Sequence, residues 1–384
     1  IVTYERWAKV LHFLPTSSQQ MKAYCKLKKY KLPKNYKTRK ETTDEDALHK
    51  LMVRHNAPIL RASIECRQLK KVLGTYVNGW KPGPDGRIHS TPGFWGAMYR
   101  ISWRNPNISA TVADKKDDYI AAGFRKCVEA PEGYVLLERD YCGIEAVLVG
   151  WFAEDEAYMR LARLGVHSFL LSHMLECPAD LTWDDEKLSA YFKKLKKDNS
   201  ARYDDAKHCI HGTNFGMGPK LMSERYEMTM ASAKRLQKLY FTIFPKIRNW
   251  QISVLDRAHK EARLVGPFNY VMWFWDVYQW DSRYGKHRLG NEAKSAISFL
   301  PRDTAAGMLK EVLLRLKPLA EEGIMLSSTH DAILCQVRED DVDRVDAIVK
   351  TEMERPVPEL NGLSIRSEAK VGKCWSEDEM KVLP

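Results

Sequence analysis

The sequence predicts a protein of mixed α and β structure, because its 384 residues contain both short apolar strands and longer helical segments. Three observations carry this prediction. An apolar run at 135–137 leads into a helical pattern, two alternating strands lie within 324–337, and helical segments cover residues 1–80 and the region after 204.

The first predicted strand is Val135-Leu-Leu137, which follows the turn signal Pro131-Glu-Gly133. The strand runs into Asp140, and a helical pattern follows from Ile144 to Trp151. A carboxylate at the end of a buried strand is costly unless it is paired or binds a metal. Asp is also a favoured helix N-cap residue, so this stretch alone leaves both interpretations open.

Two further strands are predicted between Ile324 and Val337, and they meet at His330-Asp331. Asp331 therefore lies at a β-turn, where Asp is also an ordinary turn residue. Two carboxylates on neighbouring strands could hold a pair of divalent cations, which stabilise the attacking and leaving oxygens of a phosphoryl transfer. Spacing alone favours the ordinary turn residue.

A helix is predicted after Asp204-Asp205, because acids suit a first turn. Lys207, His211 and Phe215 recur at i, i+4 spacing and so share one face of this helix. That face carries an ammonium for a phosphate, an imidazole and an aromatic plane. Gly216, placed on the same helix, costs about 1 kcal/mol against Ala unless something approaches closely. Taken alone, a mixed amphipathic helix remains the simpler interpretation.

Together the three stretches resemble family A DNA polymerases of the bacterial DNA polymerase I type. Asp140-Tyr-Cys-Gly-Ile-Glu145 is similar to motif A of that family, which reads Asp-Tyr-Ser-Gln-Ile-Glu. Lys207-xxx-His-Gly-xx-Phe-Gly216 is similar to motif B, Lys-xxx-(Phe or Tyr)-Gly-xx-Tyr-Gly. His330-Asp331-Ala332 is similar to motif C, His-Asp-Glu. Three motifs in the family's order are far more specific than any one of them.

The resemblance implies an α+β fold of the right-hand polymerase type, with an antiparallel β palm, helical fingers and a helical thumb. It implies a DNA-directed DNA polymerase that adds dNTPs to a primer 3′-OH by two-metal-ion nucleotidyl transfer. The implied cofactor is Mg²⁺, as two ions, and the implied partners are primer–template DNA and dNTPs, with no membrane and a monomeric state. The expected domains are a thumb at 1–80, a palm at 81–150 with motif A, fingers at 151–288 with motif B, and the rest of the palm at 289–384 with motif C.

The resemblance also assigns roles to single residues. Asp140, Asp331 and the backbone carbonyl of Tyr141 are the expected metal ligands. Lys207 is expected to bind the triphosphate and to help protonate the leaving group.

Glu145 is the expected steric gate, because its side chain would fill the space that a ribose 2′-OH needs. His211 and Phe215 are expected beside it in the nucleotide site. The expected DNA contacts are Arg100, Asn107, Lys294, Arg302 and His330.

Two departures affect the carboxylates and the cations. Ala332 stands where the family has a second acid, which leaves a two-carboxylate site. Tyr203 stands where the family has an arginine, and Arg202 is one residue off, which turns it about 100° around the helix.

Three departures affect the nucleotide site. His211 replaces the Phe or Tyr that packs on the sugar, and Arg302 stands where the family usually has Gln. Phe215 lacks the usual tyrosine hydroxyl and so cannot hydrogen-bond Glu145. This predicts weaker sugar or base-pair selection than in relatives with Tyr.

The composition fits an intracellular protein that binds an acidic polymer. The chain has 61 basic and 50 acidic residues, a net charge of +11. Lys22–Lys40 holds eight lysines and Arg39 in 19 residues without an acid, with Tyr24, Tyr30 and Tyr36 interleaved. This pattern favours phosphate contact over a solvated face. The eight cysteines contain no Cys-x-x-Cys pair, so buried, reduced thiols are expected.

Two alternative functions remain open. A single-subunit RNA polymerase shares the architecture but lacks an acid at the position of Glu145, which disfavours it. A catalytically inactive DNA-binding relative would account for Ala332. Nothing in the sequence resembles the acidic motifs of a 3′–5′ proofreading exonuclease, so none is expected in this chain. The chain begins at Ile1 and not at Met, which suggests a piece of a larger polypeptide.

Overall fold

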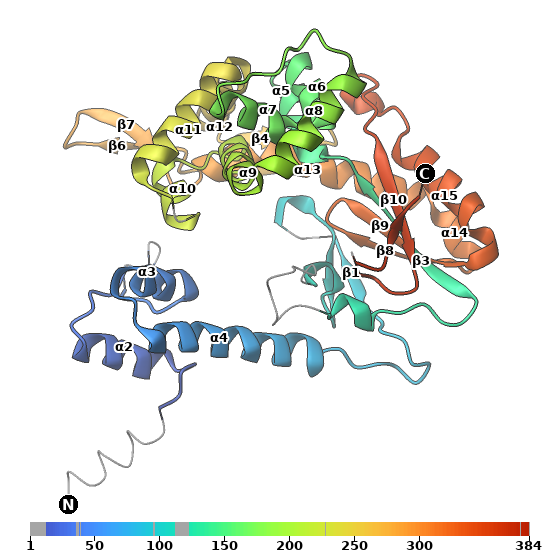
Figure 1. Cartoon of the computed structure of the whole chain (residues 1–384), viewed down its shortest axis with the longest axis horizontal. Helices are drawn as coiled ribbons and strands as arrows, with labels where there is room; N and C mark the ends of the chain where they lie inside the picture. Colours follow the sequence, from blue (N-terminus) through green and yellow to red (C-terminus); the bar gives the residue numbers. More distant parts are fainter. Residues whose placement is uncertain are drawn as a thin grey trace, which may run out of the picture. The chain divides into compact units, whose positions relative to one another are not determined.

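The computed structural model describes residues 13–35, 38, 40–94, 97–111, 123–226, 228–376 and 378–383. The chain divides into two compact units, Ile1–Thr91 with Val112–Arg125, and Pro92–Thr111 with Lys126–Pro384. Figure 1 labels their helices and strands. Tyr36 and Arg39 of the predicted basic segment lie outside the described residues.

The first unit is helical. Its helices are α2 (Ser18–Leu27), α3 (Glu45–His55) and α4 (Pro58–Val72), the last continued by a π-helical turn at Leu73–Val77. Ser17 and Asp44 cap the first two helices with their side-chain oxygens, and Pro58 opens the third at its first turn. Apolar residues of all three helices form one small core, namely Met21, Cys25, Leu48, Leu51, Leu60 and Ile64. The prediction of a helical segment at 1–80 is thus confirmed for 18–27, 45–55 and 58–77, whereas the described residues of 28–44 lie outside any helix.

The second unit is built on a five-stranded antiparallel sheet (Figure 1). Its strands, in spatial order, are β11 (Lys381–Val382), β10 (Ser367–Gly372), β3 (Tyr134–Tyr141), β9 (Ala332–Arg338) and β8 (Met325–Thr329). The three strands predicted from apolar runs and alternation, β3, β8 and β9, are confirmed and lie side by side. Asp140 pairs with Ala332 on one side and with Glu368 on the other.

One face of this sheet packs against helices, and the other carries acidic side chains beside a small apolar cluster that includes Leu136 and Leu334. Leu137, Ile333 and Ala369 point from three strands into a core shared with α5 (Ile144–Phe152), α13 (Ala293–Arg315) and α15 (Val342–Met353). Because side chains alternate along a strand, Glu138 and Asp140 point to the opposite face.

The remaining elements of this unit are mostly helices, and all of these except α14 (Lys317–Glu321) contribute to a second core. They are α6 (Glu156–Leu164), α7 (Val166–Met174), α8 (Asp185–Asp198), α9 (Ser200–Asn214), α10 (Pro219–Arg225), α11 (Met230–Ile243), α12 (Pro245–Glu261) and α14. Small antiparallel pairs join β1 (Thr91–Gly93) to β2 (Ser102–Arg104), β4 (Arg263–Val265) to β5 (Val271–Trp273), and β6 (Tyr278–Asp281) to β7 (Lys286–Leu289). Tyr158, Tyr240 and Phe299 are fully buried among these helices.

Two details of the predicted helix after Asp204-Asp205 are wrong. The helix, α9, begins at Ser200, where the backbone N–H of Tyr203 donates to the carbonyl of Asn199. The two acids therefore lie in its second turn. Gly216 is not on the helix, because α9 ends at Asn214 and Gly216 has φ +72°.

Two further expectations concern the whole chain. All eight cysteines carry free thiols, as predicted, but the expectation that they are buried is confirmed only for Cys25, Cys209, Cys335 and Cys374, and it is wrong for the exposed Cys127 and Cys177. Among the helices in the described ranges, none combines the length and the apolar character needed to cross a membrane.

Candidate active site

Asp140 and Asp331 lie on adjacent strands. Asp140 is near the end of β3, and Asp331 is at the turn between β8 and β9, directly before Ala332, the cross-strand partner of Asp140. The backbone N–H of Tyr141 donates to the carbonyl oxygen of Asp331 at 3.3 Å. His330, with φ +30°, is the residue at which the chain turns. The two acids, 191 positions apart, are thereby held together by the sheet register.

The N-cap interpretation of Asp140 is wrong. Helix α5 begins at Ile144, and its N-cap residue is Gly143 with φ +63°. The carboxylate of Asp140 is therefore not used to satisfy the backbone of this helix.

Burial and nearby negative charges raise the pKa values of both acids. Burial raises the pKa of Asp140 to about 7, and the negative charges of Asp331 and Glu138 add to the effect. Burial also raises the pKa of Asp331 to about 6, where Glu145 adds to the shift and Arg100 opposes it. Anionic carboxylates are costly in this site without further positive charge.

Three neighbours of Asp140 were not predicted. Glu138, Glu368 and Lys370 line a cavity of about 200 Å³ together with Asp140. The indole N–H of Trp375 donates to Glu138 at 2.9 Å and fixes that side chain. Alternation along β3 could have placed Glu138 on the same face as Asp140. No pattern in the sequence indicates that β10 pairs with β3. In the described part of the chain, no group of three or more His, Cys, Asp and Glu side chains could hold a metal ion.

Glu145 is held by two arginines from different segments. It lies in the first turn of α5. Arg100 donates a hydrogen bond to its Oε1, and the Nε of Arg302 in α13 lies 3.5 Å from the same oxygen. The guanidinium carbon of Arg302 also lies 4.3 Å from the ring centroid of Phe215 at the end of α9. The structure thus brings four of the predicted site residues into one network.

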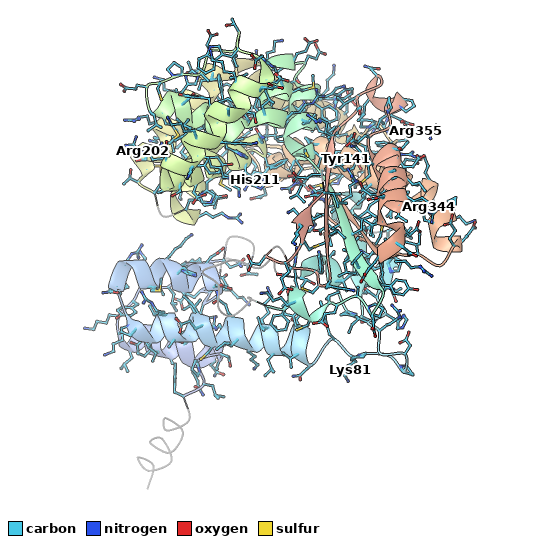
Figure 2. All side chains as sticks on the ribbon, turned by 45° about the vertical axis from the view of Figure 1, so that its right-hand side comes forward. Lys81, Tyr141, Arg202, His211, Arg344 and Arg355 are labelled. Atoms are coloured by element: carbon cyan, nitrogen blue, oxygen red, sulfur yellow. The ribbon has the colours of Figure 1, made fainter. Side chains whose placement is uncertain are left out.

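The predicted face of α9 carries Lys207 and His211, whereas Phe215 follows the helix at its C-cap position. The rings of His211 and Phe215 meet edge to face with centroids 5.3 Å apart. Burial lowers the pKa of His211, although the nearby charge of Glu145 raises it. Burial and the charge of Lys207 lower the pKa of the neighbouring His167 to about 4. Arg202 is exposed near the start of the helix, and Figure 2 labels it well away from His211.

Two other predicted residues lie on α13 and after β2. Lys294 stands two turns before Arg302 in α13, and burial together with the charges of Arg225 and Arg302 lowers its pKa. Asn107 follows β2, and its side-chain oxygen accepts a hydrogen bond of 2.8 Å from the Ser109 hydroxyl. No sequence signal pointed to Arg225, because its place depends on the packing of α10 against α9.

Tyr141 contributes its backbone and not its side chain to this face of the sheet. Its ring is buried in the core, and its hydroxyl donates to the carbonyl of Met353 at 2.8 Å. Figure 2 labels Tyr141 among the elements around the sheet.

The fold is that of a polymerase domain. The POL domain of Pol1 from M. smegmatis, in complex with DNA primer-template and dNTP, has the same fold with a TM-score of 0.74. The match covers 95% of this chain and 61% of that chain at 20% sequence identity. The family model of DNA polymerase family A matches residues 3–377. The chain belongs to DNA polymerase family A.

Curated relatives agree with this assignment. The chain is similar to the thermostable DNA polymerase I of Thermus filiformis, with 27% identity over 354 residues, which are 89% of this chain and 39% of the relative. It is similar to the thermostable DNA polymerase I of Thermus aquaticus, with 24% identity over 353 residues, 89% of this chain and 39% of the relative. It is also similar to DNA polymerase I of Helicobacter pylori, with 24% identity over 353 residues, 90% of this chain and 36% of the relative. The chain thus spans less than half the length of these relatives.

Proposed function

We propose that this chain transfers nucleotides from dNTPs to a primer 3′-OH under the direction of a DNA template, with release of pyrophosphate. The observation that carries the proposal is the Asp140–Asp331 pair on adjacent strands, next to the network around Glu145. Primer–template DNA and dNTPs are the proposed partners, and the proposed active species is a monomer. The proposed thumb, palm and fingers keep the bounds expected from the sequence, 1–80, 81–150 with 289–384, and 151–288.

Asp140, Asp331 and the backbone carbonyl of Tyr141 would hold two Mg²⁺ ions. Oxygen donors are the ligands that Mg²⁺ prefers. The raised pKa values of both carboxyl groups indicate a site that gains from added positive charge. When bound, the ions would lower the pKa of the primer hydroxyl and neutralise the charge of the leaving phosphates.

The side chains of α9 bind the incoming nucleotide. Lys207 pairs with the triphosphate and can donate a proton to the leaving pyrophosphate. His211 and Phe215 present an imidazole edge and an aromatic ring to the sugar and the base. His330, at the turn that carries Asp331, steadies the primer terminus.

Glu145 selects the sugar, because a ribose 2′-OH would need the space that its carboxylate fills. Positive and amide side chains around the network hold the DNA. They are Arg100, Asn107, Lys294 and Arg302.

Primer extension tests the proposal. We expect the wild type to extend a primer on a DNA template with dNTPs and Mg²⁺, and Asp331→Ala to bind the same primer–template but not to extend it. Loss of binding in the variant would instead indicate a folding defect, which Asp331→Asn, of nearly equal size, would test.

The same assay separates the alternatives. Preferential use of rNTPs would indicate an RNA polymerase. Salt-sensitive binding without extension by the wild type would indicate an inactive DNA-binding relative, the alternative that Ala332 favours. A primer with a mismatched 3′ end, incubated without dNTPs, should keep its length, because we propose no proofreading exonuclease among these residues.

A further inference from the structure

Arg302 makes two contacts that join separate elements. Its Nε lies 3.5 Å from Oε1 of Glu145, close enough for an ion pair. Its guanidinium carbon lies 4.3 Å from the centroid of the Phe215 ring. The Nε–H is buried, and no described residue accepts a hydrogen bond from it. The guanidinium is therefore oriented by an aromatic face on one side and a carboxylate on the other.

The backbone fixes the aromatic half of this contact. Gly216, with φ +72°, lets the end of α9 approach α13 closely, since a Cβ there would lie 2.8 Å from Cδ1 of Ile297. Phe215 precedes it and is 7% exposed. Pro301, inside α13, directly precedes Arg302. The ring is thus placed by the close approach of two elements, and Arg302 projects from a helix.

The carboxylate of Glu145 contacts two cations, Arg100 and Arg302. Arg100 donates to the same Oε1 that faces Arg302. Each of the three side chains is about one-fifth to one-third exposed, so solvent only partly screens their charges. A carboxylate held by Arg100 alone could follow the rotation of that side chain. Arg302 adds a second, stacked cation that restrains it.

We infer that Arg302 is the positioning residue of the sugar gate: it holds the Glu145 carboxylate in place by stacking on Phe215, and so supplies the restraint that the missing hydroxyl of residue 215 cannot give. This inference rests on the proposed function. It predicts that replacing Arg302 changes sugar selection more than it changes DNA binding.

Single-nucleotide incorporation with a dNTP and with the matching rNTP tests this inference on one primer–template. The readout is the ratio of the two kcat/KM values, in which a change in DNA affinity cancels because both nucleotides meet the same complex. Arg302→Leu should lower the preference for the dNTP about tenfold, which corresponds to ~1.4 kcal/mol. The preference of Arg302→Lys for the dNTP should lie between those of the wild type and Arg302→Leu, because Lys keeps the charge but not the planar group that stacks.

Two double variants assign the effect to the gate. Phe215→Tyr in the Arg302→Leu background should restore the preference, because its hydroxyl can donate to Glu145. In a Glu145→Ala background, Arg302→Leu should no longer change the ratio.

Lys294→Ala is the matched control on the same helix. It should weaken binding to primer–template and leave the ratio of the two nucleotides unchanged. If Arg302→Leu extends with dNTPs and keeps the wild-type ratio, the inference is overturned. If Arg302→Leu does not extend at all, an unchanged ratio in Arg302→Gln and Arg302→Lys overturns it equally. Failure of the wild type to incorporate any nucleotide would instead overturn the proposed function.

Discussion

At the scale of single residues, Arg302 links the carboxylate of Glu145 to the ring of Phe215. The sequence predicts the places of Lys207, His211 and Phe215 through helical spacing, and that of Asp331 through a turn between two alternating strands. Arg302 as the partner of Glu145 could not be predicted, because it requires α13 to pack against α5 and the end of α9. Long-range packing of this kind has no local sequence signal.

Asp303, the neighbour of Arg302, is a second unpredicted residue. Its side chain has no exposed surface, and none of the described residues hydrogen-bonds either carboxyl oxygen. It fits because residue 266 is Gly, where a Cβ would lie 1.8 Å from Oδ2. Burial raises the pKa of Asp303 from 3.8 to about 7, and the charge of Lys310 only partly opposes this.

The raised pKa of Asp303 predicts a pH-dependent stability. The folded state holds its proton up to about pH 7, while the unfolded state releases it near pH 3.8. The contribution of protonated Asp303 to the free energy of unfolding is therefore fully present below about pH 4 and is lost as the pH rises through about 7. Asp303→Asn should raise the free energy of unfolding by a few kcal/mol at pH 8, since one pKa unit is worth about 1.4 kcal/mol. The increase should be smaller at pH 5. Urea unfolding at both pH values checks this, and an equal gain at the two would contradict it.

At the scale of elements, an apolar run predicted β3, alternation predicted β8 and β9, and apolar periodicity predicted α5. The strands β10 and β11 were not predicted, because β10 pairs with β3 across more than 200 residues of sequence and β11 pairs with β10. The start of α9 was misplaced because acidic residues suit a first turn but do not require one. Gly216 was misplaced because α9 ends at Asn214.

A buried ion pair joins the sheet to α15. Arg139, 4% exposed on β3, donates two hydrogen bonds to Asp346, of 2.8 and 2.6 Å. It donates a third of 3.0 Å to the hydroxyl of Ser367. This side chain lies on the packed face, between Leu137 and Tyr141 along the strand.

Breaking this pair should destabilise the second unit. Arg139→Ala leaves the Asp346 carboxylate partly buried without its partner, so we expect a loss of roughly 3–5 kcal/mol. Equilibrium unfolding in urea gives the value. The paired replacement Arg139→Met with Asp346→Leu removes both charges and should recover much of the loss. A loss in Arg139→Ala below about 1 kcal/mol would contradict this role.

At the scale of the whole molecule, the charge of +11 follows directly from composition, and it predicts salt-sensitive binding to DNA. The lysines in the described part of Lys22–Lys40 are mostly exposed, and one of them, Lys26, pairs with Glu41 at 3.4 Å. Lys28, Lys29 and Lys31 are exposed in the same segment and form no ion pair among the described residues. They are therefore available for phosphates.

Charge reversal at these three lysines should lower DNA affinity. The triple variant Lys28→Glu, Lys29→Glu and Lys31→Glu should reduce the slope of log affinity against log salt by up to ~0.9 for each duplex phosphate that the protein no longer neutralises. Fluorescence anisotropy with labelled primer–template at several salt concentrations measures the slope. The matched control reverses Lys193, Lys194 and Lys197 on α8, which we expect to be a solvated face. Equal changes in both triple variants would indicate only a general charge effect.

The central claim is that Asp140 and Asp331 perform the chemistry, and that no other acid on the same face of the sheet does. Rapid-quench incorporation of one complementary dNTP into a pre-bound primer–template tests it most directly. Asp140→Asn should lower the incorporation rate on the order of a thousandfold, as expected for the loss of several kcal/mol of metal-assisted stabilisation. Glu138→Gln, the same chemical change two residues away on the same face, should retain a rate within about tenfold of the wild type. Near-wild-type incorporation by Asp140→Asn, or an equal loss in Glu138→Gln, would contradict the assignment.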